Sequence, residues 1–388
     1  MSLPLASKLK QKRPSFKSSY LRNSLQAIWY HRLGKRDDAI RTWVDLLNQD
    51  SPMPRFKEAR YLIEAQAFQE VRDYLEGLSS PQIEDSSEIN YLLTRCYLGQ
   101  GLIPQAKEKI ELAIQTKPQN ATYWDLLADC YLELGAWRDA IRALDNSLRA
   151  APKHPETIYR LGIIYAFHGE YLEALRCFQG CCQLRPRQST YWEMKAEMHL
   201  HLEQLTDACT SFDKALRYGG TPDLAARLAY CYIQSNQTKK GIQYYEFTLK
   251  YEPDHYDALS NLAAAYQNND RSLDALKLLE RARNIHSNDP ILLNNLAYTL
   301  VHLGRVRKAL EYYREALELA PDHPLILYNL SVCLARKGNW QEGIDSLNKL
   351  IEIDPDHSSG WALLGTIYEQ TEKFDTAIDC FNKALKLA

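Results

Sequence analysis

The stretch LNNLAYTLVHLGRVRKALEYYREALELAPDH, residues 293–323, is typical of two amphipathic helices joined by a turn. Each predicted helix carries an apolar stripe at spacings of three and four: Leu293, Leu296 and Leu300, then Ala309, Tyr313 and Ala316. Gly304 interrupts the pattern between the stripes, and Pro321 ends it. Two helices this short cannot bury both stripes alone, so neighbouring segments must cover them.

The same pattern recurs about every 34 residues along the chain. Its clearest copies begin near Ala121, Pro155, Ser189, Pro222, Tyr256, Pro290, Pro324 and Ser358. Weaker copies begin near Tyr20, Pro52 and Ser87, which gives eleven helix-turn-helix units in all.

Small residues recur where two helices must approach closely. In the first helices they are Ala27, Ala59, Ala128, Gly162, Ala196, Ala229, Ala263, Ala297, Ser331 and Gly365, with Thr94 larger. In the second helices they are Ala39, Ala106, Ala140, Ala174, Ala208, Gly241, Ala275, Ala309, Gly343 and Ala377, with Val71 larger. Glycines mark most turns inside the units, and Asn236 and Asp270 replace two of them, because both residue types tolerate left-handed backbone.

The agreement of small, large, glycine and proline positions across many copies resembles the tetratricopeptide repeat (TPR) family, over roughly residues 20–388. The resemblance implies an all-α, right-handed superhelical solenoid of about eleven helix-turn-helix units with a concave inner groove. Elementary physics agrees with a stack, since each pair buries its stripe only against its neighbours.

The chain ends differ from this body. Residues 1–36 hold nine Lys or Arg and no acidic residue, and we expect residues 1–19 to form a basic, disordered leader. A transit peptide, or a leader that binds an acidic partner or a membrane surface, remains an alternative. At the other end the pattern stops inside the last second helix without a polar cap. We therefore expect either a longer protein or a partner over that end, including a second copy of this chain.

Within residues 20–388 the repeats are weaker at 20–120 and regular at 121–388. Near 78–88 a linker rich in Ser, Pro and Asp follows a unit that lacks the turn glycine. Near 218–222 the pair Gly219-Gly220 replaces the closing proline. We expect a soft joint at each of these two places.

Composition bears on the class of function. The formal net charge of -2 argues against a general nucleic-acid binder. No apolar run is long enough for stable membrane insertion, and nine cysteines without a secretory signal are typical of reduced thiols in the cytoplasm. The sequence holds no Gly-rich phosphate loop, nucleophile elbow or metal-protease motif, so we predict no catalysis and no cofactor.

Two sets of reactive residue types fit packing or turns better than chemistry. Cys177, Cys181 and Cys182 share one helix, but Cys181 occupies a packed position equivalent to Ala316. Cysteines 96, 130, 231 and 333 share a different position with one another, beside the packed aromatic, where they fit as small core residues. Histidines 154, 255, 323 and 357 each follow a closing proline in different units. Equivalent residues of neighbouring units lie about 8–10 Å apart, too far to share one metal ion. We predict no metal site.

The candidate binding residues lie on the first helices. Asn261, Asn295 and Asn329 occupy one equivalent position and should line the groove as a ladder. An amide offers a donor and an acceptor, which match the two polar groups of a peptide unit. Similar ladders in the superhelix of O-linked N-acetylglucosamine transferases hold extended polypeptide. The alternative is that asparagine is simply common at this position in the family.

Other side chains should face the same groove. Arg160 and Arg227 occupy the ladder position in earlier units, and the remaining candidates are Tyr159, Tyr230, Tyr298, Tyr328, His302 and Arg336. This mixture suits an extended segment with acidic or aromatic side chains. We therefore predict a non-catalytic scaffold or adaptor that binds an extended peptide. The alternatives are the substrate-recruiting arm of a larger enzyme, such as a glycosyltransferase, and a self-associating assembly subunit.

Overall fold

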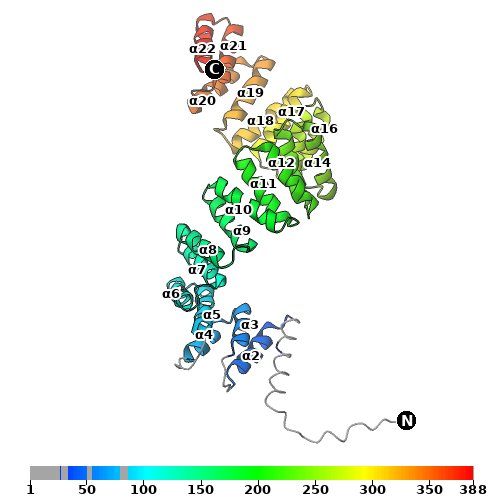
Figure 1. Ribbon diagram of the computed structural model, residues 1–388. Coiled ribbons are helices and arrows are strands. Elements are labelled where there is room, and N and C mark those ends of the chain that lie inside the picture. Colours follow the sequence, from blue (N-terminus) through cyan, green and yellow to red (C-terminus); the bar gives the residue numbers. More distant parts are fainter. Residues whose placement is uncertain (1–26, 28–33, 50–54, 79–85, 388) are drawn as a thin grey trace, which may run out of the picture. The chain divides into compact units, whose positions relative to one another are not determined.

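The computed structural model describes residues 27, 34–49, 55–78 and 86–387. Within these residues the regular structure consists of 21 α-helices, α2–α22, and no strand (Figure 1). The chain divides into two compact units, Met1–Pro186 and Arg187–Ala388. The first unit holds α2 (Arg36–Leu47), α3 (Phe56–Glu64), α4 (Phe68–Gly77), α5 (Ser86–Gly99), α6 (Ile103–Thr116), α7 (Ala121–Glu133), α8 (Trp137–Ala150), α9 (Pro155–Phe167) and α10 (Tyr171–Leu184).

The second unit holds twelve further helices. They are α11 (Ser189–His201), α12 (Leu205–Arg217), α13 (Pro222–Gln234), α14 (Thr238–Tyr251), α15 (Tyr256–Gln267), α16 (Ser272–Ile285), α17 (Pro290–His302), α18 (Val306–Leu319), α19 (Pro324–Lys337), α20 (Trp340–Ile353), α21 (Ser358–Gln370) and α22 (Phe374–Leu387). No helix in the described part of the chain is long and apolar enough to cross a membrane.

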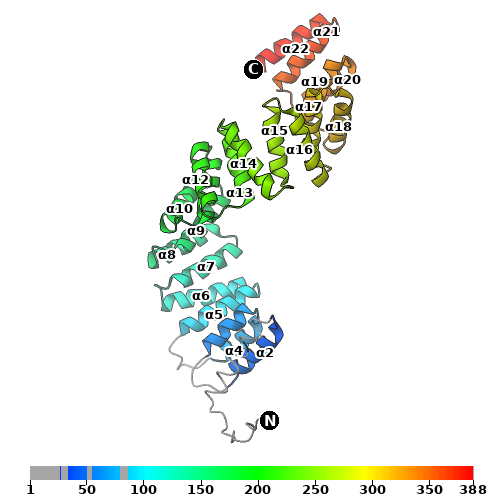
Figure 2. The ribbon, with the colours of Figure 1, turned by 90° about the vertical axis from the view of Figure 1, so that its right-hand side faces the viewer.

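Each predicted helix-turn-helix unit from residue 55 onward is a pair of adjacent helices, from α3 and α4 to α21 and α22 (Figure 2). The helix α2 is the second helix expected for the first unit. The all-α class and the helix-turn-helix organisation are therefore confirmed. The expected leader at residues 1–19 lies outside the described residues.

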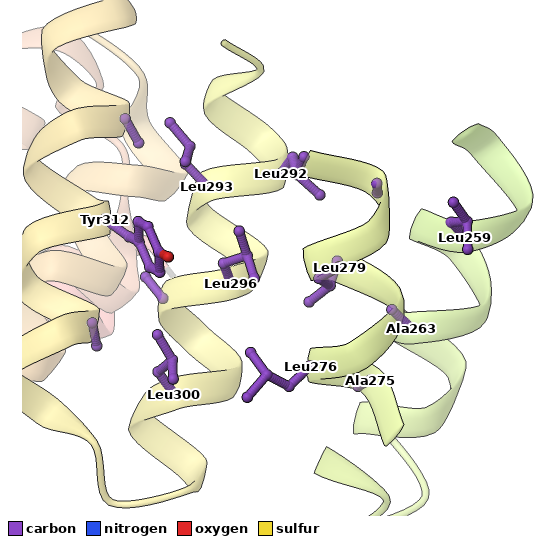
Figure 3. Close-up of a cluster of buried hydrophobic side chains, with 14 of the residues drawn as sticks. Leu259, Ala263, Ala275, Leu276, Leu279, Leu292, Leu293, Leu296, Leu300 and Tyr312 are labelled. Carbon is purple, nitrogen blue, oxygen red and sulfur yellow. The ribbon is translucent and has the colours of Figure 1, made fainter. Parts of the chain in front are cut away.

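The register of the small residues is confirmed, because every predicted small position in both helices of the repeats is buried. The two larger exceptions, Thr94 and Val71, are also fully buried. In the second unit, Figure 3 shows the leucines of α16 and α17 side by side, among them Leu279 and Leu296. Both have no exposed surface, so the pair α15 and α16 is covered by the next pair, as a stack requires.

The turns inside the pairs place one residue in left-handed backbone. Asn236 and Asp270 have φ values of 61° and 58°, which confirms their predicted role as glycine substitutes. Gln66, Glu203 and Glu372 adopt the same conformation, with φ of 61°, 59° and 59°. For a residue with a Cβ this conformation costs roughly 1–2 kcal/mol, so helix pairing outweighs local preference at these turns.

The division of the chain into two compact units falls at Pro186 and Arg187, and the soft joints near 78–88 and 218–222 stay a prediction. Residues 79–85 lie outside the described residues. At the other predicted joint, Gly219 has a φ of 144°, and a Cβ added to Gly220 would lie 2.7 Å from the Cα of Leu216. This connection is closely packed, and only glycine fits at Gly220 without a backbone shift.

The last helix, α22, exposes large apolar side chains. Phe374 is 60% exposed, Ile378 57% and Leu385 76%. In contrast, Ala377 of the same helix is buried against the stack. The helix α22 therefore has one side that is covered by the stack and one apolar side that is exposed.

Candidate functional site

A pocket of about 410 Å³ lies among the first helices of three successive pairs in the second unit. This volume is within the range of roughly 300–1,000 Å³ that is usual for ligand pockets. Its lining comes from α11, α13, α14, α15 and the residue before α15: Glu197, Leu200, Asp223, Ala226, Arg227, Tyr230, Tyr245, His255, Asp257 and Asn261. Three predicted binding residues, Arg227, Tyr230 and Asn261, thus lie in one pocket.

The guanidinium of Arg227 is occupied by three carboxylates. Its Nη1 donates to Glu193 at 3.2 Å and to Glu197 at 3.0 Å, both on α11. Its Nε lies 3.1 Å from Asp223, one turn earlier on α13. Partial burial works to lower the pKa of Arg227, but these three carboxylates outweigh it and raise that pKa. Arg227 therefore joins α13 to α11 and has little charge left for a ligand.

The pocket as a whole has an excess of negative charge. Its lining holds three carboxylates, on Glu197, Asp223 and Asp257, against one guanidinium. Asp223 also lies 3.5 Å from Nε2 of His255. Asp257 is exposed and belongs to no ion pair with another described residue. The site is consequently complementary to a cation, and Asp257 is its least neutralised acid.

Tyr245 supplies a buried hydroxyl to the same pocket. Its side chain is 1% exposed, and no hydrogen bond of ordinary geometry reaches this hydroxyl from the described residues. Burial raises the pKa of Tyr245, and the nearby amide of Asn261 opposes this shift. A buried hydroxyl without a hydrogen bond destabilises the folded chain. Binding of a ligand that supplies a hydrogen-bonding group would remove this cost.

Arg160 makes an equivalent arrangement in the first unit. It pairs with Asp129 of α7 and lies 3.9 Å from the carboxylate of Asp125 on the same helix. Asp125 also accepts a hydrogen bond from Thr157 at 3.1 Å. Burial raises the pKa of Asp129, with Arg160 acting in the opposite direction. Arg160, like Arg227, is held by the preceding first helix.

The other two ladder asparagines are linked through a residue that the sequence interpretation passed over. Asn294 is 2% exposed and donates to the side-chain oxygen of Asn295 at 3.3 Å. Its own side-chain oxygen accepts from Nδ2 of Asn329 at 2.9 Å. Asn295 and Asn329 are half-buried, and each amide retains hydrogen-bonding capacity beyond these contacts.

The remaining candidates do not form one cluster with the pocket. The ring centroids of Tyr298 and His302 are 4.5 Å apart on α17, and both side chains are exposed. Tyr328 packs against His357, with centroids 5.4 Å apart. Arg336 is exposed in the last turn of α19. Tyr159 belongs to the first unit and packs against Phe178 at 5.7 Å.

The cysteines behave as packed thiols. All nine lie in the described residues and are free, and eight of them are buried. Cys181 donates to the carbonyl of Pro155 at 3.4 Å, and burial raises its pKa to about 12. No group of three or more His, Cys, Asp or Glu side chains in the described ranges is arranged to hold a metal ion.

Sequence reasoning missed the acidic and buried members of the pocket. The available signal was a pair of acids four residues apart on the first helix that precedes each ladder arginine: Asp125 and Asp129, then Glu193 and Glu197. Residues four apart share one helix face, so these acids could have been assigned to the groove. Tyr245 gave no such signal, because aromatic residues fill the core throughout the repeats.

Comparisons with known proteins extend these observations. Family models described as tetratricopeptide repeat match residues 91–155, 159–225 and 294–358, residues 254–322, and residues 358–388. The DnaJ homolog subfamily C member 3 of Gallus gallus is 25% identical over 306 residues, which cover 70% of this chain and 60% of that protein. Tetratricopeptide repeat protein 6 of Homo sapiens is 23% identical over 202 residues, which cover 50% and 38%.

The chain thus spans about 60% of the length of the DnaJ relatives that it matches. Among solved structures it is similar to the APC/C hetero-tetramer Cut9-Hcn1, at 14% identity, 95% coverage of this chain, 87% of that chain and a TM-score of 0.49. It is similar to yeast Tom70 at 15% identity, 96% and 93% coverage and a TM-score of 0.44. Because tetratricopeptide models match more than half of the sequence, this chain belongs to the tetratricopeptide repeat family, whose scaffolds are generally non-catalytic and typically bind proteins or peptides.

Proposed function

We propose that this chain is a non-catalytic scaffold or adaptor that binds an extended peptide segment along the first helices of its second unit. The observation that carries the proposal is the pocket between α11, α13 and α15, in which the hydroxyl of Tyr245 is buried and makes no hydrogen bond of ordinary geometry to the residues that the structure describes. Asn261 beside it is exposed, and its amide offers both a donor and an acceptor to a peptide unit.

Hydrogen bonds alone are too weak for this role. Each contributes about 0.5–1.5 kcal/mol net, whereas micromolar affinity needs about 8 kcal/mol. The remainder must come from side chains of the ligand in pockets such as the one around Tyr230 and Tyr245. We therefore propose that the ladder fixes the peptide backbone and that the pocket selects a side chain.

Selection from a library of random peptides tests the proposal. The full chain is immobilised, enriched peptides are synthesised, and their affinities are measured for the chain and for the Asn261/Asn295/Asn329 triple alanine variant. We expect enriched peptides that bind the variant at least about tenfold more weakly, since a lost amide contact costs about 1 kcal/mol. Unchanged helicity by circular dichroism is the control. Equal binding to both chains would refute the ladder, and a selection without enrichment would refute peptide binding here.

Self-association is a second candidate, supported by the exposed apolar side of α22. Phe374, Ile378 and Leu385 lie there, and burying such side chains against a second copy would be favourable. Sedimentation equilibrium of the chain and of its Ile378→Glu variant tests this. We expect a dimer that the substitution dissociates, whereas a monomer at all concentrations would exclude this candidate.

We also propose a cytoplasmic location, which the nine free thiols support because reducing compartments keep cysteines unpaired. Imaging of a tagged chain with compartment markers tests it. Accumulation in a secretory compartment would contradict the proposal.

A further inference from the structure

The negative charge of the pocket around Tyr245 indicates which kind of peptide side chain can bind there. We infer that the segment bound there carries a Lys or Arg side chain, with its cationic head at Asp257 and Asp223. The inference rests on the proposed function and adds the chemical class of the ligand. It replaces the acidic segment that the arginines suggested from sequence.

The first step is the state of Arg227. A guanidinium that contacts Glu193, Glu197 and Asp223 at 3.0–3.2 Å already has carboxylates as partners. An acidic ligand would have to compete with three fixed carboxylates for it, and would meet their repulsion. Arg227 therefore positions the acids of the pocket and does not select an anion.

The second step is the surplus of carboxylates. After Arg227 neutralises one negative charge, two remain among Glu197, Asp223 and Asp257. Asp257 is in the first turn of α15, exposed, and in no ion pair with another described residue. It can accept charge-assisted hydrogen bonds from an ammonium or guanidinium without breaking a contact of the fold.

The third step is the buried hydroxyl. Tyr245 lines the same pocket, is 1% exposed, and has no hydrogen bond of ordinary geometry within the described residues. It is suited to donate to a backbone carbonyl of the segment whose basic side chain reaches Asp257. The ring of Tyr230, which is 45% exposed, can pack along the aliphatic stem of that side chain or face its cation.

The test uses the full chain and peptides enriched from the random library. We expect Lys or Arg at one fixed position of these peptides, and a loss of about tenfold in affinity when that residue is replaced by Gln. In the chain, Asp257→Asn should weaken binding severalfold and reduce its dependence on salt. Asp375→Asn is the matched control, because Asp375 is likewise the exposed second residue of a helix, α22, and does not line the pocket.

Each outcome separates this inference from the proposed function. Enrichment of Asp or Glu, or of peptides without a charge, would overturn the basic ligand and leave peptide binding intact. Basic peptides whose affinity is the same for the wild-type chain, Asp257→Asn and Asp375→Asn would overturn the assignment to this pocket. Absence of any enriched peptide would overturn both the inference and the function on which it rests.

Discussion

Nδ2 of Asn329 donates to the side-chain oxygen of Asn294 at 2.9 Å, and this pair joins the sixth residue of α19 to the fifth residue of α17. The same two positions pair Arg227 of α13 with Glu193 of α11. They also bring Arg160 of α9 close to Asp125 of α7. In three units, the sixth residue of the first helix thus contacts the first helix of the preceding unit. The contact is an ion pair for two of them and a hydrogen bond between amides for the third.

Removal of Asn294 should weaken the stack between α17 and α19. Its amide is 2% exposed and bonds to both Asn295 and Asn329, so Asn294→Ala leaves half-buried polar groups without these partners. We expect a loss of about 1–3 kcal/mol in the free energy of unfolding. Chemical denaturation measures it, with Asn284→Ala on the exposed side of α16 as the control. Equal midpoints for the two variants would contradict the role of this amide.

Replacement of Arg227 should strengthen the binding of a basic peptide. Arg227→Gln removes the cation that neutralises Glu193, Glu197 and Asp223, so the pocket becomes more negative. We expect a severalfold gain in affinity at low salt that shrinks as salt is raised. The loss of stability should be about 1 kcal/mol or less, because the side chain of Arg227 is 42% exposed. A fall in affinity in a fully folded variant would show instead that Arg227 contacts the ligand.

Two glycines in neighbouring helices should respond oppositely to alanine. A Cβ on Gly162 would lie 2.7 Å from the ring of Phe178, which is fully buried, so Gly162→Ala should cost about 1–3 kcal/mol. A Cβ on Gly180 meets only Ile158, at 3.8 Å. Gly180→Ala should therefore stabilise the helix by about 0.5–1 kcal/mol. Thermal denaturation compares the two, and a shift of the same sign in both would contradict the packing of α9 against α10.

The thiols should be nearly inert in the folded chain. Burial raises the pKa of Cys96, Cys130 and Cys231 to about 12, and only a thiolate reacts with a disulfide reagent. We expect slow labelling by such a reagent near pH 8, and reaction of all nine cysteines after unfolding. Rapid labelling of several thiols in the native chain would contradict their burial.

The same pKa shifts set the sign of a pH effect on stability. Above the ordinary thiol pKa of about 8.5, the unfolded chain loses protons that the folded chain retains. The free energy of unfolding should therefore decrease as the pH rises past that value. Denaturation midpoints at pH 7 and at higher pH measure this effect, and serine variants of the buried cysteines should reduce it.

The fold was predictable from sequence because it depends on a repeated pattern. Small residues such as Ala263 and Ala297 recur at the same position of successive repeats. One such position per helix is enough to locate the point where that helix packs closely against its neighbour. The turn at Gln66 was not predictable, since nothing in a glutamine indicates left-handed backbone. There the packing of α3 against α4 decides the conformation.

From sequence, the candidate site could be predicted only as a set of helix faces, without the partners of its side chains. Periodicity placed Arg227 and Asn261 on the inner positions of their helices, and both lie in the pocket. It could not show that Glu193 and Glu197 neutralise Arg227, because such partners lie 34 and 30 residues away and depend on side-chain geometry between repeats. Only the structure therefore showed that the net charge of the pocket is negative.

The pairing of sixth and fifth positions also limits how repeats of this chain could be rearranged. A repeat that carries Arg227 needs acids on the repeat before it, and one that carries Asn329 needs an amide there. Moving the arginine repeat behind Asn294 would place a guanidinium against an amide and would leave Glu193 and Glu197 without their cation. Repeats with the same backbone structure therefore fit only particular neighbours, because their contact side chains must be complementary. These side chains thus determine the order of the repeats along the chain.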